Sequence, residues 1–314
     1  MPTGGSRPRR RSSQGEWSPS VLPLPLPVLV IVALTTVAVM LTMAPATTTP
    51  PATSPPASPV TRTPPAMPLP AGSFPDASTT GVRPGTTLRL SGSIATSSDG
   101  QVIEDLDIAG SVRVQHDDVT IRNVRVRSAG QAISILDNTG LVVEDCELDG
   151  TGATDGASAI GDQNYTIRRC DVHHFGEGPR SNGQVTIEGN WFHDFVDFVS
   201  QGAHQDVVQI TSGYGTTIRG NSMVIDVAGA NASIMIGSYQ GGDILVENNL
   251  LGGGGYTAYC GGSNGYTNVR FIDNRFSTAY YPRSGYHGPF VYCESATLSG
   301  NVWHDGPNAG QPAI

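Results

Sequence analysis

A short phrase recurs along this chain and constrains its fold more than any other feature. The phrase is an apolar residue, two variable residues, a small residue that is often Asn, one variable residue and a second apolar residue. Eight copies follow one another at intervals of 20 to 31 residues, and they begin at Ile121, Val143, Ile167, Ile187, Ile218, Val246, Phe271 and Leu298. A ninth, weaker copy begins at Ile103. A phrase repeated at such intervals predicts a solenoid in which each copy belongs to one coil.

The residues of the phrase favour strands over helices. Its apolar positions carry Val, Ile, Leu and Phe, and Gly or Asn punctuates each unit. No stretch after residue 70 sustains a helical apolar period. The sequence therefore predicts an all-β chain, with a parallel β-helix solenoid of about nine coils over residues 74–314. Because stacked strands lie about 4.8 Å apart, such a rod would be roughly 40 Å long.

The small position of the phrase predicts a column of stacked side chains. It carries Asn in the last five copies, at Asn190, Asn221, Asn249, Asn274 and Asn301. We expect these residues at the bend between two strands, because Asn tolerates the left-handed backbone that a sharp bend needs. Stacked side-chain amides can also hydrogen-bond along the column.

The chain has four cysteines, which suit an exported protein. Cys260 and Cys293 fall in neighbouring C-terminal coils, and we predict a disulfide between them. Cys146 and Cys170 occupy the small position of two successive phrases. Stacked Cα atoms at the strand spacing permit a disulfide there, and two buried free thiols are the alternative.

Together with the coil pattern, two motifs carry a resemblance to a known family. Phe74-Pro-Asp-Ala-Ser-Thr-Thr-Gly-Val82 with Pro84-Gly-Thr-Thr-Leu88 resembles the segment that leads into the coils, and His204-Gln-Asp206-Val-Val-Gln209 resembles an H-x-D-x-x-Q motif. The family is the right-handed parallel β-helix (pectate-lyase-like) superfamily, in particular secreted actinobacterial β-helix repeat proteins. The resemblance implies the fold and a polysaccharide partner. The catalytic motifs of polygalacturonases are missing, and the calcium cluster of pectate lyases cannot be placed residue by residue.

The first 73 residues differ in composition from the rest. Residues 1–20 form a basic region, residues 21–46 an apolar stretch that ends in Ala-Pro-Ala, and residues 47–73 a linker rich in Pro and Thr. The apolar stretch predicts a cleaved signal peptide or an uncleaved transmembrane signal-anchor, and the linker is predicted to be disordered. Either alternative exports residues 74–314, which are then secreted or anchored to the outer face of the membrane.

The charge of the exported part limits its partners. Residues 72–314 carry 13 Arg, no Lys and 26 Asp plus Glu, a formal charge of −13. Such a charge argues against nucleic acid and against unaided binding of polyanions. We expect a monomer, associated with the membrane through its N-terminus only where that segment is uncleaved.

The strongest group of candidate catalytic residues lies at His204-Gln205-Asp206-Val207-Val208-Gln209. Asp206 is predicted to act as a general acid or base, or as a cation ligand, with His204 assisting and Gln209 binding substrate. Alternatively, His204 and Asp206 satisfy backbone groups at a coil corner.

Alignment of the coils by their strand ends adds further candidates. Asp155, Arg180 and Asp206 are expected along one face on three successive coils. Glu177, in the same segment as Arg180, is a candidate for substrate binding. Two carboxylates could serve as the acid and the base of glycoside hydrolysis. They could instead hold Ca²⁺ to clamp a uronate while Arg180 acts as the base of a β-elimination. A surface ladder of ion pairs predicts the same residues.

Histidines recur just after the phrase. Alignment stacks His173 on His193 and places His174 beside Asp194, which indicates either a metal site or a structural device at the corners. The structural interpretation is favoured because His-Asp recurs at the same offset in the last coil. Asp197 lies slightly further along and could reach the neighbouring substrate cleft.

Nine of the ten tyrosines follow residue 200, in loops that are also rich in Gly. Tyr256, Tyr281, Arg283 and His287 are candidates for substrate binding, because aromatic faces stack on sugar rings and Arg binds carboxylates. These loops could equally cover the C-terminal end of the rod, which a solenoid needs.

Two functional hypotheses follow. The first is an exported lyase or glycoside hydrolase that acts on an extracellular or cell-wall glycan. The second is a non-catalytic glycan-binding or structural β-helix protein of the cell surface.

Overall fold

The computed structural model describes residues 73–154, 156–237 and 239–314. The basic region, the predicted signal or anchor segment and the linker up to residue 72 lie outside these ranges. Within the described residues there are 26 strands and two 3-10 turns, η1 (Val199–Gln201) and η2 (Gly262–Asn264), but no α-helix. The all-β prediction is confirmed. None of the helical turns in this part of the chain is long and apolar enough to cross a membrane.

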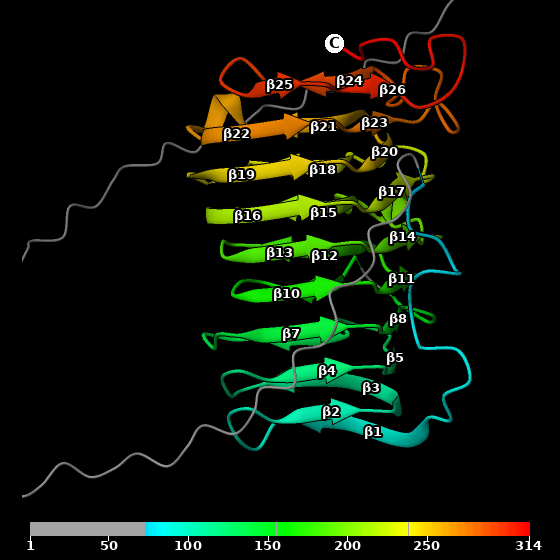
Figure 1. The fold of residues 1–314 in the computed structure, drawn as a ribbon, viewed down its shortest axis with the longest axis vertical. Coiled ribbons are helices and arrows are strands. Elements are labelled where there is room, and N and C mark those ends of the chain that lie inside the picture. Colours follow the sequence, from blue (N-terminus) through cyan, green and yellow to red (C-terminus); the bar gives the residue numbers. More distant parts are fainter. Residues whose placement is uncertain (1–72, 155, 238) are drawn as a thin grey trace, which may run out of the picture. The chain divides into compact units, whose positions relative to one another are not determined.

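One sheet of the described residues takes nine strands in chain order, all parallel (Figure 1). They are β2 (Val102–Glu104), β4 (Thr120–Arg122), β7 (Leu141–Glu144), β10 (Tyr165–Arg168), β13 (Val185–Glu188), β16 (Gly213–Arg219), β19 (Gly241–Glu247), β22 (Thr267–Ile272) and β25 (Thr297–Ser299). The register places the first apolar residue of every phrase in one column, from Ile103 opposite Ile121 to Phe271 opposite Leu298. Each copy of the phrase therefore belongs to one coil, as predicted.

A second parallel sheet holds the other 17 strands of the described chain. It begins with β1 (Arg89–Ala95), which pairs with the long strand β3 (Leu106–Val114), and two runs of strands continue from β3. We call the nine-stranded sheet the first run and these two the second and third runs. The second run is β5 (Arg125–Arg127), β8 (Glu147–Asp149), β11 (Asp171–His173), β14 (Trp191–His193), β17 (Ser222–Ile225), β20 (Leu250–Gly253), β23 (Arg275–Phe276) and β26 (Val302–Trp303). The third run is β6 (Ile133–Ile135), β9 (Ser158–Gly161), β12 (Glu177–Ser181), β15 (Asp206–Ile210), β18 (Ala232–Ile236), β21 (Tyr256–Cys260) and β24 (Gly288–Val291).

The core is a stack of aligned apolar side chains between the three runs. The second apolar residue of the phrase forms a column in the second run, from Ile108 opposite Val126 to Phe276 opposite Trp303. Most members of this column and of the first have no exposed surface. Each such side chain contributes on the order of 1.5–3 kcal/mol through burial, so the repeated phrase supplies the driving force for coiling.

The five Asn residues of the phrase form a hydrogen-bonded ladder inside the rod. The side-chain Nδ2 and the backbone N–H of each member donate to Oδ1 of the next, from Asn190 to Asn301, at 2.9–3.1 Å. The predicted stacking of amides is confirmed, but the predicted left-handed backbone is wrong for these residues. The residue just before each Asn takes that conformation instead, as at Gly189 (φ 66°) and Asn248 (φ 52°). The bend is made there, and the Asn itself is free to point inward.

The segment before β1 packs along the side of the coils rather than on their end (Figure 1). The backbone N–H of Arg83 donates to Oδ1 of Asn123 at 2.8 Å, and its guanidinium bonds to Asp145. Arg169 bonds to both Asp145 (2.6 Å) and Glu144 (3.0 Å). Glu144 is only 3% exposed, so this ion-pair network neutralises a buried charge while it fastens the leading segment to the coils.

The C-terminal residues return over the last coil. Val302 pairs with Pro312 in an antiparallel bridge, and the N–H of Ala313 donates to the carbonyl of Asn301 at 3.0 Å. Ala313 is buried against the core. This return covers the open end of the Asn ladder, as the terminal coil of a solenoid requires.

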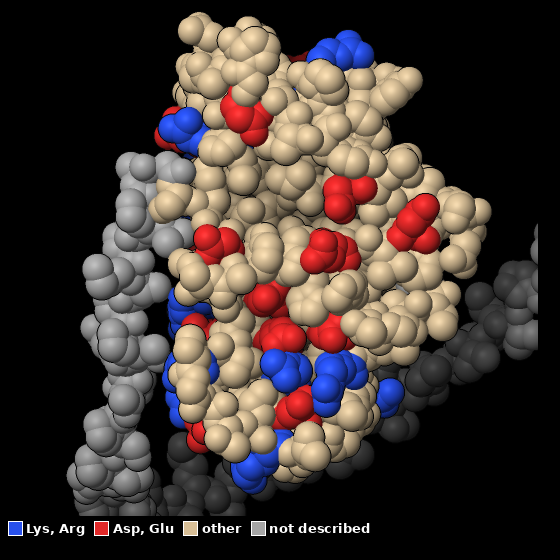
Figure 2. All heavy atoms as spheres, turned by 90° about the vertical axis from the view of Figure 1, so that its right-hand side faces the viewer, with Lys and Arg blue, Asp and Glu red and all other residues tan. Residues whose placement is uncertain are grey.

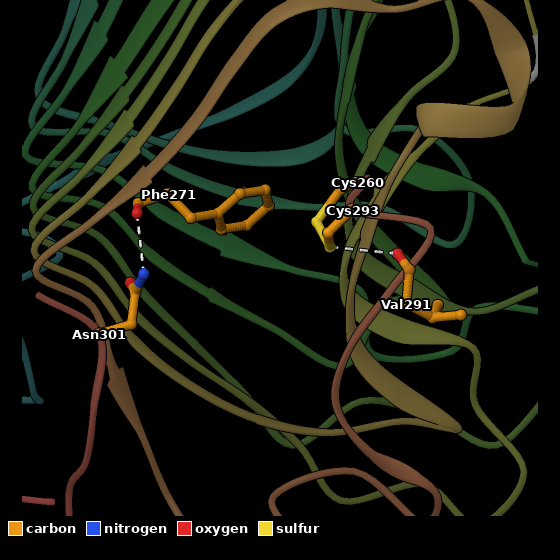
Figure 3. The surroundings of a disulfide bond; sticks show 5 residues. All are labelled: Cys260, Phe271, Val291, Cys293 and Asn301. Carbon is orange, nitrogen blue, oxygen red and sulfur yellow. Dashed lines mark hydrogen bonds between the residues drawn. A yellow bond between two sulfur atoms is a disulfide. The ribbon is translucent and has the colours of Figure 1, made fainter. Parts of the chain in front are cut away.

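The predicted disulfide between Cys260 and Cys293 is confirmed. It joins the end of β21 to the loop after β24, and the ring of Phe271 points toward it across the core (Figure 3). The other described cysteines, Cys146 and Cys170, are buried free thiols, so the second of the two alternatives holds for them. A disulfide is typical of a protein that folds in an oxidising compartment.

Candidate functional site

Polar side chains meet where β12 lies against β15 in the third run. Arg180 is opposite Gln209, and its Nε donates to Oε1 of Gln209 at 3.1 Å. Its Nη2 donates to Oε2 of Glu177 at 2.8 Å. Glu177 is the first residue of β12 and Asp206 the first of β15. We call Glu177, Arg180, Asp206 and Gln209 the β12–β15 cluster.

Asp206 is an unusually buried carboxyl group. It has no exposed surface, and neither carboxyl oxygen has a hydrogen-bond partner among the described residues. Burial raises the pKa of Asp206 well above its usual range, and the negative charge of Glu177 adds to the shift. Asn231, the backbone of Ala232 and Arg180 favour the ionised form but are outweighed. Asp206 therefore keeps its proton at a pH where an ordinary carboxyl group is ionised.

Glu177 shares this environment but has a charged partner. It is 6% exposed, and burial raises its pKa although the neighbouring Arg180 opposes the shift. Because Arg180 stabilises the ionised form of Glu177 directly, Asp206 is the member of the pair that holds a proton more firmly. The cluster thus sets two carboxyl groups with raised pKa on adjacent strands, and the pKa of Asp206 is raised well above its usual range.

Glycine lets the two strands approach closely enough to form the cluster. A Cβ atom at Gly178 would lie 2.1 Å from the carbonyl oxygen of Val207, so any larger residue would push β12 away from β15. In the register, Ile160 lies opposite Pro179, whereas Ile210 lies opposite Ser181, two residues further along β12. The sequence alignment, which equated the strand ends at Ile160 and Ile210, is two residues out here, and Glu177 rather than Arg180 begins its strand as Asp206 does.

The remaining predicted catalytic residues lie at the edge of the cluster or beyond what is described. His204 is exposed, and its Nδ1 is 2.9 Å from Nδ2 of Asn231. Its charge acts on Glu177, which places it near the cluster. Asp155 lies outside the described residues. Asp197, which was predicted to reach the substrate cleft, is exposed and accepts a hydrogen bond from the N–H of Val199 (2.9 Å), and its charge acts on Tyr280.

The tyrosine-rich loops form a continuous run of ring contacts. Tyr281 contacts Tyr286, Tyr286 contacts His287, and His287 contacts Tyr256, with centroids 4.8–5.8 Å apart. Tyr256 then meets Tyr259 edge to face. Three of the predicted substrate-binding residues therefore lie in one aromatic run. The fourth, Arg283, donates to the carbonyl of Tyr286 at 3.0 Å and so supports the loop.

Tyr259 connects this aromatic run to the cluster; it is one of the tyrosines of the Gly-rich loops but was not among the predicted substrate-binding residues. Gln209 lies opposite Met235, which lies opposite Tyr259, so all three follow Arg180 in one outward column. Burial raises the pKa of Tyr259, and the nearby Asp206 contributes to the shift. The signal was present in the spacing, because Tyr259 follows Tyr256 by three residues as Gln209 follows Asp206.

The histidine corners behave partly as predicted. The rings of His173 and His193 stack at 5.1 Å. The two nitrogens of His193 contact Asp171 (2.7 Å) and Asp194 (2.8 Å). Burial disfavours the charged imidazole, but these two carboxylates outweigh it and raise the pKa of His193. The corner after β14 is therefore closed by the hydrogen bonds of His193. The N–H of His174 donates to the carbonyl of Asp194 at 3.0 Å, so His174 lies beside Asp194 as predicted.

A hollow of about 380 Å³ lies away from these residues, on the first sheet. It is lined by Thr139, Gly140, Leu141, Val142, Asn164, Tyr165, Thr166 and Gln184. This lining has no carboxylate, Arg or His, so the hollow offers less chemistry than the β12–β15 cluster.

Comparison with known proteins adds no family assignment. No protein-family model, no curated protein and no solved structure matches this chain.

Proposed function

We propose that this protein is an exported polysaccharide-active protein with a right-handed, pectate-lyase-like coil, and that it cleaves glycosidic bonds at the β12–β15 cluster. The observation that carries the proposal is the pair of carboxyl groups with raised pKa, Glu177 and Asp206. Perturbed carboxyl pairs gather at catalytic sites, because acid–base chemistry needs two groups in different protonation states. The predicted signal segment and the disulfide support export.

Hydrolysis is the reaction that the cluster supports best. One carboxyl group must donate a proton to the leaving oxygen while a carboxylate activates water or attacks the sugar. Glu177 is the more accessible member, with its side chain 8% exposed, and Arg180 beside it is exposed enough to contact a sugar hydroxyl or a uronate. Asp206 has no exposed surface and does not reach the leaving oxygen, so in this proposal Glu177, whose pKa is raised, donates the proton to that oxygen and recovers one from the attacking water. Gln209 fixes the guanidinium of Arg180 between the two strands.

The aromatic run would extend the binding surface away from the cluster. Tyr256, Tyr281 and His287 present ring edges and faces on which sugar rings stack. Tyr259 lies between them and Gln209 in the outward column. A glycan bound along this column would cross successive coils, so several sugar units would contribute to affinity.

Non-catalytic glycan binding is the second candidate. The observation that favours it is the burial of both carboxyl groups, since Glu177 is only 6% exposed and Asp206 is not exposed at all. In that case Arg180, Gln209 and the aromatic run bind the glycan, and the acidic pair only shapes the strands.

A panel of glycans incubated with the full-length protein, with and without Ca²⁺, tests these proposals. Hydrolysis yields new reducing ends, β-elimination also yields the ultraviolet absorbance of an unsaturated uronate, and binding alone yields neither. We expect hydrolysis, with a loss on the order of 100-fold or more in Glu177→Gln, because an amide cannot act as acid, base or nucleophile. The matched control is Glu188→Gln, which removes an exposed carboxylate from β13. Full activity in Glu177→Gln would overturn the site assignment.

A further inference from the structure

Three side chains converge at one corner of the rod, on the second strand run and away from the β12–β15 cluster. The Nδ1 atoms of His173 and His174 lie 2.7 Å apart. Oδ1 of Asp149 lies 3.1 Å from Nδ1 of His174 and 3.6 Å from Nδ1 of His173. Two imidazole nitrogens and a carboxylate oxygen thus surround one point within 4.8 Å of one another.

The backbone explains why two successive histidines face the same point. Successive side chains of a strand point to opposite sides, and His173 is the last residue of β11. His174 has a φ of 61°, and this left-handed conformation turns its side chain back toward that of His173. Asp149 lies opposite His173 in the parallel register, so it completes the group from the preceding coil.

Nδ1 of His174 is crowded by more polar atoms than one linear hydrogen bond can serve, although Oγ1 of Thr151 gives its own hydrogen to Oδ1 of Asp149 at 2.5 Å. An imidazole nitrogen has a single hydrogen or lone pair in the ring plane. Nδ1 of His174 nevertheless has three polar neighbours within 3.2 Å, namely Nδ1 of His173, Oδ1 of Asp149 and Oγ1 of Thr151. Two imidazole nitrogens and a carboxylate oxygen that converge in this way form a ligand set of the kind that holds a cation.

Neighbouring groups hold the side chains of Asp149 and His173 in place. Oδ1 of Asp149 accepts the backbone N–H of Thr151 at 2.8 Å, and Nε2 of His173 lies 3.6 Å from Oε1 of Glu147. Outer carboxylates of this kind orient metal-binding imidazoles through the second ring nitrogen. Acidic side chains with Arg among them also gather over this side of the molecule (Figure 2), which favours the approach of a cation.

The next coil provides a comparison. Its corner has Asp194 where this coil has His174, and His193 there is fully used by Asp171 and Asp194. Replacement of a carboxylate by a second imidazole converts a closed hydrogen-bonded pair into a site with two nitrogen ligands. The preference of imidazole for borderline divalent metals over Ca²⁺ then sets the class of ion.

We propose that Asp149, His173 and His174 bind a divalent transition-metal ion of the Zn²⁺ class. The side chain of His174 is 43% exposed, whereas those of His173 and Asp149 are 12% and 14% exposed. The ion is therefore held by three protein ligands at the surface, with its remaining position open to water or to a ligand. The proposal does not depend on the function assigned to the β12–β15 cluster.

Isothermal titration of the untagged full-length protein with Zn²⁺, and separately with Ca²⁺, tests the site. We expect one equivalent of Zn²⁺ to bind and Ca²⁺ not to compete. His174→Ala and Asp149→Asn should each weaken Zn²⁺ binding by about 10-fold or more, since even outer-sphere changes cost 10–100-fold. His304→Ala is the matched control, because it removes the imidazole at the same offset in the last coil, where its ring contacts Phe74, and it should leave Zn²⁺ affinity unchanged.

A Co²⁺-substituted sample gives a second measurement that does not depend on activity. Its visible spectrum should report mixed nitrogen and oxygen ligation and should be lost in His173→Ala, with thermal unfolding recorded to show that the variant is folded. Unchanged Zn²⁺ affinity in folded His174→Ala, stronger binding of Ca²⁺ than of Zn²⁺, or no Zn²⁺ binding at all would each overturn the proposal.

Discussion

Nδ2 of Asn221 donates a 2.9 Å hydrogen bond to Oδ1 of Asn249, one coil further along the chain. The same oxygen accepts the backbone N–H of Asn221, also at 2.9 Å. Nδ2 of Asn249 in turn donates to the carbonyl of Ile218 and to Oδ1 of Asn274. Each Asn of the ladder therefore serves buried groups on both of its neighbours.

Asn249→Ala should lower the free energy of unfolding by about 2–4 kcal/mol, because it leaves a buried N–H and a buried carbonyl unpaired. Asn301→Ala, at the end of the ladder, should cost less, since no further Asn follows it in the ladder. Urea unfolding of both variants checks this order. Equal losses would mean that the ladder does not act as a connected unit.

Ionisation of Asp206 should make stability depend on pH. Burial raises the pKa of this carboxyl group in the folded state, so the folded protein holds the proton over a range in which the unfolded chain has lost it. Stability is then complete below about pH 4, the pKa of an unfolded Asp, and falls as the pH rises toward the folded pKa. Asp206→Asn removes this loss of stability because the amide does not ionise.

Thermal unfolding of Asp206→Asn and of the unmodified protein between pH 4 and pH 8 measures the effect. The two should be similar at the acidic end, and the variant should gain up to about 1.4 kcal/mol for each pH unit above it until the folded pKa is reached. Asp137→Asn, which alters an exposed carboxylate, should follow the unmodified protein. A variant that is less stable at pH 8 would contradict the raised pKa.

Loss of the disulfide should destabilise the last coils. Cys260 and Cys293 are separated by 33 positions, and closure of a loop of this length contributes about 3–4 kcal/mol in the chain-entropy model. The double variant Cys260→Ser/Cys293→Ser should therefore unfold at a lower temperature. Thiol titration of the denatured, unreduced protein provides the covalent check, with an expected value of two thiols per chain from Cys146 and Cys170.

Arg169 should matter more than an exposed arginine in an equally close ion pair. Arg169→Met removes hydrogen bonds to Asp145 and to Glu144, which is 3% exposed, and should cost about 1.5–3 kcal/mol. Arg122→Met breaks the pair with Glu104, in which both side chains are well exposed, and should cost at most about 1 kcal/mol. Chemical denaturation of the two variants compares them. A smaller loss in Arg169→Met than in Arg122→Met would contradict the role of the network.

The fold was predictable because its determinants are local and repeated. Ile103 and Leu298 are 195 positions apart, yet both mark the first apolar position of the phrase, and the register places them in one column. After residue 70 no helical apolar period offers another way to bury these residues, so a column on stacked strands is the expected arrangement. The left-handed residue was misplaced because Asn is common both at bends and in ladders, and composition alone does not separate the two uses.

The candidate site was only partly predictable for a related reason. Glu177, Arg180 and Gln209 were identified, but the phrase fixes the first and second runs more firmly than the third. The ends of these strands do not mark the register, because Ile160 lies opposite Pro179 whereas Ile210 lies opposite Ser181. Asp149 as a neighbour of His173 was within reach of the alignment, since both occupy the same offset after the phrase. The left-handed turn at His174, which completes that group, was not.

The interior column that ends in Asn301 does not have the same character along its length. Leu106, Val124, Cys146 and Cys170 occupy the positions that Asn takes in the later coils, so the amide ladder spans only the C-terminal part of the rod. Along this column the early coils are joined by backbone bonds, apolar contacts and the long thiol hydrogen bonds of Cys146 (3.6 Å) and Cys170 (3.8 Å), which are weaker than the amide bonds of the ladder. A pulling force along the axis would therefore meet less mechanical resistance in the early coils, and the coils beyond Asn190 would remain intact for longer.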